Sequence, residues 1–174
     1  VAATYASGGH SSIDSVPDSR GVTVNVHYSI SELPVTSYKP RLADDRVGYF
    51  LTVLKDFSKE ESDDDRFVRY ITRWNLEKAD SKAEMSTPKE PIIFWLEKTI
   101  PFKYRKPIRD GILEWNKAFA KAGFYDAIEV RQQPDDAPWE PGDVRYNTYR
   151  WITSGVGFAM GPSRVNPTTG QILD

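Results

Sequence analysis

Residues 92–123, IIFWLEKTIPFKYRKPIRDGILEWNKAFAKAG, decide the fold of this sequence. The first five form a continuous apolar run, which is typical of a short buried strand, and Pro101 ends the element. Over residues 104–122, apolar side chains recur at intervals of four and three, which predicts one long amphipathic helix. Pro107 is expected near the first turn, where a missing N–H is tolerated, and Gly123 is expected to end the helix. The recurring side chains are Ile108, Ile112, Trp115, Phe119 and Ala122.

The residues that follow the helix predict further strands, over residues 127–133 and 144–152. Residues 155–162 are rich in small side chains, so they predict an extended segment that a second backbone can approach. The sequence NPTTG at residues 166–170 is turn chemistry, and it predicts a hairpin into residues 171–174.

The part of the chain before residue 92 is predicted to be rich in strands. Alternating β-branched residues predict a strand over residues 22–30, and an apolar run predicts another over residues 47–54. Residues 67–78 fit a strand or a helical face, and their Val, Ile, Thr, Tyr and Trp content favours the strand. The predicted organisation is a loose arm over residues 1–21, a β-rich segment over 22–79, a linker over 80–91, and a further part over 92–174.

Composition excludes several classes of function. The 23 basic and 25 acidic residues give a net charge of −2, which provides no field to attract nucleic acid. No apolar run approaches the ~20 residues that span a bilayer. The chain has no cysteine, so disulfides, thiolate nucleophiles and cysteine-ligated zinc are excluded.

Metal-binding and catalytic residues are not predicted within this chain. Its two histidines, His10 and His27, are not followed by a second ligand at helical spacing, and a zinc site needs three or four ligands. The acidic run 63–65 lacks the alternate spacing of a calcium loop. The aspartate pairs at residues 44–45 and 135–136 are candidates for general acid–base catalysis. Their turn-like contexts favour instead a position on the solvated surface.

Tryptophan offers a separate hypothesis, because its ring can stack on sugars. Most of the five tryptophans fall on apolar faces of predicted elements, where core packing explains them. Trp139 lies between Pro138 and Pro141 and is predicted to be exposed. A carbohydrate-binding module that uses Trp139 is therefore one alternative function.

The second half of the sequence resembles the N-terminal subdomain of metzincin-type zinc peptidases. The order of strand, amphipathic helix, two strands, extended segment and turn is similar to the order in that subdomain. The sequence itself is more similar still to a group of bacterial zinc-dependent metalloproteases. The resemblance covers about residues 20–174. The strings that carry it are YKPRLADDRVGYF at 38–50, RYITRW at 69–74, FWLEKTIP at 94–101, ILEWNKAF at 112–119, AGF at 122–124, DVRYN at 143–147 and GPSRVNP at 161–167.

The resemblance implies an α+β fold, with a mixed twisted sheet and one long helix, and a zinc ion in the parent enzyme. The family's zinc-binding helix carries H-E-x-x-H. This sequence has no such motif, so we expect it to be the N-terminal part of the enzyme, with the zinc helix beyond Asp174. The resemblance makes residues 92–174 the N-terminal part of the catalytic domain, and residues 22–79 either an accessory domain or a pro-segment across the cleft. An acidic cap on the zinc from Asp44 or Asp45 is a further hypothesis. Export from the cell is expected by resemblance alone.

The resemblance also implies a substrate-binding segment, because metzincin-like enzymes pair an edge strand antiparallel with the peptide substrate. An exposed edge offers unpaired N–H and C=O groups that an added peptide satisfies. We therefore expect an extended peptide or protein as partner, together with the remainder of the catalytic domain. A non-catalytic peptide-binding module is the alternative, and an edge strand that a neighbour merely covers is a third possibility. The residues of the segment are Gly157, Phe158, Ala159, Met160, Gly161, Pro162 and Ser163.

Overall fold

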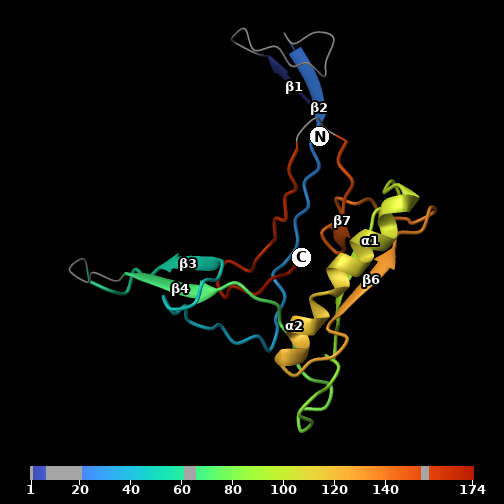
Figure 1. Cartoon of the computed structure of the whole chain (residues 1–174). Helices are drawn as coiled ribbons and strands as arrows, with labels where there is room; N and C mark the ends of the chain where they lie inside the picture. The colour runs from blue at the N-terminus through green and yellow to red at the C-terminus, as the bar shows by residue number, and fades with distance from the viewer. Residues whose placement is uncertain (1, 7–20, 61–65, 154–156) are drawn as a thin grey trace. The chain divides into compact units, whose positions relative to one another are not determined.

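The computed structural model describes residues 2–6, 21–60, 66–153 and 157–174 (Figure 1). The chain is an α+β protein, and it divides into two compact units, Val1–Glu32 and Leu33–Asp174. Residues 80–91, which the sequence predicts as a linker, lie inside the second unit. Each unit is described separately below.

The first unit contains an antiparallel pair of strands, β1 (Ala2–Ala6) and β2 (Gly21–Asn25). Ala2–Ala6 therefore form a strand, whereas the sequence predicts a loose arm there. The strand predicted over residues 22–30 ends at Asn25, which pairs with Ala2. The rest of the arm, with His10, lies outside the described residues.

The second unit begins with a hairpin of β3 (Leu51–Lys55) and β4 (Phe67–Ile71), which pair antiparallel. Residues 41–43 add to the other side of β4, where the Ala43 N–H donates to the Arg69 carbonyl at 2.8 Å. The strand preference over residues 67–78 is confirmed for β4 only. The acidic run 63–65 lies outside the described residues.

A three-stranded sheet forms the centre of the second unit, in the order β6-β5-β7. Its strands are β5 (Ile92–Leu96), β6 (Ile128–Gln132) and the short β7 (Asn147–Tyr149). Both pairings are parallel, whereas the resemblance implied a mixed sheet. The core lies around it and includes the buried Ile92, Leu96, Ile100, Ala127 and Ile128.

The crossover from β5 to β6 is helical, as parallel neighbours require. The single helix predicted over residues 104–122 is instead two helices, α1 (Phe102–Leu113) and α2 (Asn116–Lys121). They are separated where the Trp115 N–H turns back to the Ile112 carbonyl, which is the tighter i−3 spacing. Because α1 begins at Phe102, Pro107 lies inside the helix and not in its first turn. Gly123 has φ 88°, which confirms it as the terminator.

The predicted linker over residues 80–91 is folded against the end of α2. It turns back on itself, with the Ala79 N–H donating to the Thr87 carbonyl at 2.9 Å. Ser86 is buried, donates its N–H to the Gly123 carbonyl and accepts the N–H of Tyr125. Prolines in this stretch therefore mark a turn within one unit.

A hairpin closes the described chain, as the sequence NPTTG predicts. Val165 and Ile172 form an antiparallel bridge, and the Asn166 N–H donates to the Gln171 carbonyl at 2.8 Å. The second arm also runs parallel to the residues after β4, where the Arg73 N–H donates to the Gly170 carbonyl at 3.1 Å. Gly170 has φ 81° and lies against the Ile71 backbone.

Replacing Gly170 with alanine is expected to lower the free energy of unfolding by about 2 kcal/mol. An added Cβ would lie 2.7 Å from the Ile71 carbonyl oxygen, and the positive φ disfavours any side chain. Gly142→Ala is the matched control, because a Cβ there meets no atom within 4 Å. Urea titrations followed by tryptophan fluorescence measure the stability of the two variants. Equal unfolding midpoints would contradict close packing of Gly170 against the Ile71 backbone.

Candidate functional site

The predicted substrate-binding residues 157–163 form an exposed segment that belongs to no strand. The expected edge strand is therefore wrong for the described chain: these residues join neither β7 nor another strand. Within the described residues, none of their backbone N–H or C=O groups makes a hydrogen bond. Phe158 and Met160 are 64% and 71% exposed. The segment thus presents free backbone groups and two apolar side chains to solvent.

Glu97 fixes the backbone that leads into this segment. It follows β5 directly and is only 8% exposed. Its N–H donates to the Tyr149 carbonyl at 3.1 Å, and its carboxylate accepts the Trp151 N–H at 2.9 Å. The Trp151 ring stacks on the Tyr104 ring of α1, with centroids 5.1 Å apart. We call this group of contacts the N-terminal anchor.

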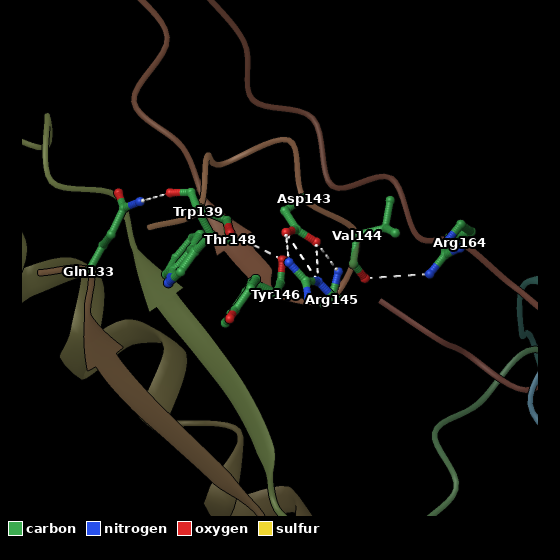
Figure 2. A network of polar contacts seen from close by, with 8 residues as sticks. All are labelled: Gln133, Trp139, Asp143, Val144, Arg145, Tyr146, Thr148 and Arg164. Carbon is green, nitrogen blue, oxygen red and sulfur yellow. Dashed lines mark hydrogen bonds and ion pairs between the residues drawn. The ribbon is translucent and has the colours of Figure 1, made fainter. Parts of the chain in front are cut away.

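Arg164 fixes the backbone that leaves the segment. Its N–H donates to the Asp174 carbonyl at 2.9 Å, and its guanidinium pairs with the Asp174 carboxylate at 3.3 Å. Figure 2 shows the same guanidinium directed at the Val144 carbonyl, 3.4 Å away. These contacts and the hairpin that follows form the C-terminal anchor.

Side chains of the loop before β7 hold that loop on the sheet (Figure 2). The Trp139 ring stacks on Tyr146 at 4.0 Å between centroids and meets the edge of Trp95 at 5.5 Å. Gln133, 1% exposed, accepts the Lys98 N–H and donates to the Trp139 carbonyl at 3.2 Å. Trp139 is 8% exposed, so the predicted exposure is wrong and the sugar-stacking hypothesis loses its basis.

An apolar cavity of about 620 Å³ lies between the helices and one face of the sheet. Its lining residues include no Asp, Glu, His, Lys or Arg, and their polar side-chain groups are the Tyr149 hydroxyl and the indole N–H groups of Trp74 and Trp115, so the cavity offers space for apolar atoms and no acid–base pair. It is lined by Trp74, Phe94, Ile108, Gly111, Ile112, Trp115, Phe119, Ile128 and Tyr149.

The acidic residues singled out in the sequence lie on the surface. Asp44 is bonded to Arg46, with its Oδ1 2.8 Å from the guanidinium Nε, and this hydrogen bond lowers the pKa of Asp44 to about 2. Asp44 thus pairs within its own loop. Asp45 and the pair at residues 135–136 are exposed.

The described residues do not assemble a metal centre. No group of three or more His, Asp or Glu side chains in the described ranges is placed to hold an ion, and His27 is exposed on an irregular stretch. None of the helices in the described part of the chain has the length and apolar character to cross a membrane.

Comparison with known family models gives a match in the N-terminal part of the chain. Residues 2–79 match a family model described as "Domain of unknown function (DUF5117)". The match ends next to the stretch predicted as a linker. No curated protein and no solved structure matches the chain.

Sequence reasoning missed both anchors. Glu97 carried a usable signal, because a carboxylate directly after a buried strand of a parallel sheet lies at the carboxyl edge, where loops and ligands meet. Arg164 and Asp174 carried no local signal, since their pairing depends on the hairpin between them.

Replacing Glu97 with alanine is expected to cost about 1–3 kcal/mol of unfolding free energy, because the Trp151 N–H loses its acceptor. Glu97→Gln keeps an oxygen acceptor at the same place and should lose less than half as much. Chemical denaturation measures both variants. If the two substitutions lower the free energy of unfolding equally, Glu97 does not stabilise the protein through its hydrogen bond to Trp151.

Proposed function

We propose that residues 157–163 bind an extended peptide, and that the chain supplies the substrate-binding side of a zinc-dependent metalloendopeptidase. The observation that supports peptide binding is the run of unpaired backbone groups between two anchored ends. An incoming strand satisfies such groups by main-chain hydrogen bonds. The segment is outside any sheet in the free protein, so the peptide itself completes the ladder.

The peptidase part of the proposal is supported by the strings that resemble bacterial zinc-dependent metalloproteases over about residues 20–174. The residues that the structure describes do not fit a zinc site, because they provide no group of three ligands. Zinc binding, the attacking water and proton transfer are therefore assigned to no residue here. The role of this chain is to position the peptide, and export with the parent enzyme remains part of the proposal.

A non-catalytic peptide-binding module is the second candidate function. The same unpaired segment favours it, since binding requires only residues that this chain contains. The two candidates differ in the fate of the bound peptide.

Replacing Ala159 with proline is expected to weaken the binding of an extended peptide about fivefold to tenfold, because proline removes one main-chain donor. Val35→Pro is the matched control: Val35 is fully exposed, and its N–H makes no hydrogen bond within the described residues. Fluorescence anisotropy of labelled peptides measures the affinity. Equal loss in both variants, or no loss in either, would contradict pairing at 157–163.

Cleavage separates the two candidates. The natural gene product that contains these residues is expected to hydrolyse extended peptides, to lose this activity with a chelator and to regain it with zinc. Activity that a chelator leaves unchanged would exclude the zinc peptidase. Tight binding without cleavage would establish the non-catalytic module.

A further inference from the structure

Large and small side chains alternate in the segment. Phe158 and Met160 are large and apolar, whereas Gly157, Ala159 and Gly161 are small. In an extended chain, successive side chains point to opposite faces. Once a peptide pairs with the segment, one face therefore carries an aromatic ring and a thioether, and the other face is nearly bare.

The two glycines are not explained by the packing of the described chain. A Cβ at Gly157 or Gly161 would meet no atom within 4 Å, and neither residue has the positive φ that favours glycine. If a peptide pairs with this segment, glycine at these positions lets the second backbone approach closely. The bare face thus leaves room for a partner that the described residues do not provide.

The exposed side chains and the unpaired backbone point to the same kind of ligand. Phe158 and Met160 are 64% and 71% exposed, and burying such apolar surface is favourable. An extended peptide pairs with the backbone and at the same time places side chains opposite these two residues. A small apolar molecule would leave the N–H and C=O groups of the segment unpaired.

We infer that the segment selects peptides in which apolar side chains recur at every second position, facing Phe158 and Met160. This inference rests on the proposed peptide binding. Residues directly opposite each other in a ladder share a face, so apolar partners at alternate positions of the peptide meet the ring and the thioether. Methionine adapts to different partners, which favours a class of side chains over one residue type.

The footprint is short, because Pro162 has no N–H to continue the ladder. Pairing is therefore expected to weaken beyond residue 161. A peptide needs only two apolar residues, at positions i and i+2, to satisfy both Phe158 and Met160.

Three peptides of equal length and charge test the inference: one with apolar residues at alternate positions, one with the same residues placed side by side, and one fully polar. The alternating peptide is expected to bind the whole protein about three- to tenfold more tightly than the other two. Phe158→Ala and Met160→Ala should each reduce this preference. Phe102→Ala, at an exposed position of α1, should leave it unchanged.

The outcomes distinguish the inference from the proposed function. If all three peptides bind equally and Ala159→Pro still weakens them, pairing stands and the selectivity is wrong. If none of them binds, the proposed function is wrong as well. If the protein self-associates in sedimentation and Phe158→Ala abolishes this, the segment binds a second copy and the inference is overturned.

Discussion

The hydrogen bond from the Trp151 amide to the Glu97 carboxylate is the constraint on which the candidate site depends. It fixes the chain where it leaves β7, and the pairing of Arg164 with Asp174 fixes it again beyond residue 163. A segment held at both ends loses less conformational entropy when a ligand orders it. In the proposed function, the two anchors therefore lower the entropic cost of ordering residues 157–163 on a peptide.

Both anchors rely on the parallel sheet. Glu97 directly follows β5, which is the central strand of this sheet. Since β5 is buried at Ile92 and Leu96, the position of Glu97 is fixed. The loop that reaches β7 is held by Gln133 and by the stacked rings of Trp139 and Tyr146. That loop also provides the Val144 carbonyl that Arg164 contacts. The side chains of Trp139 and Tyr146 thus hold the loop before β7, whose backbone contacts Arg164 next to the segment.

Local pattern predicted the elements that local sequence controls: the strand at Ile92–Leu96, the terminator Gly123 and the hairpin at residues 166–170. Predictions failed where distant contacts decide. Trp139 lies between two prolines, yet Trp95 and Tyr146 bury it. Residues 80–91 have a linker's composition, but Ser86 bonds to the end of α2. Residues 157–163 are exposed but lie outside any sheet, and their own sequence did not indicate this difference from the expected edge strand.

Amide hydrogen exchange of residues 157–163, with and without an alternating apolar peptide, tests the central claim most directly. The account predicts fast exchange in the free protein and protection on binding that is confined to this segment. The amides of Asn166 and Leu173, which already donate to the Gln171 and Arg164 carbonyls in the hairpin, serve as the internal reference. Peptide binding that leaves exchange at residues 157–163 unchanged would contradict the account.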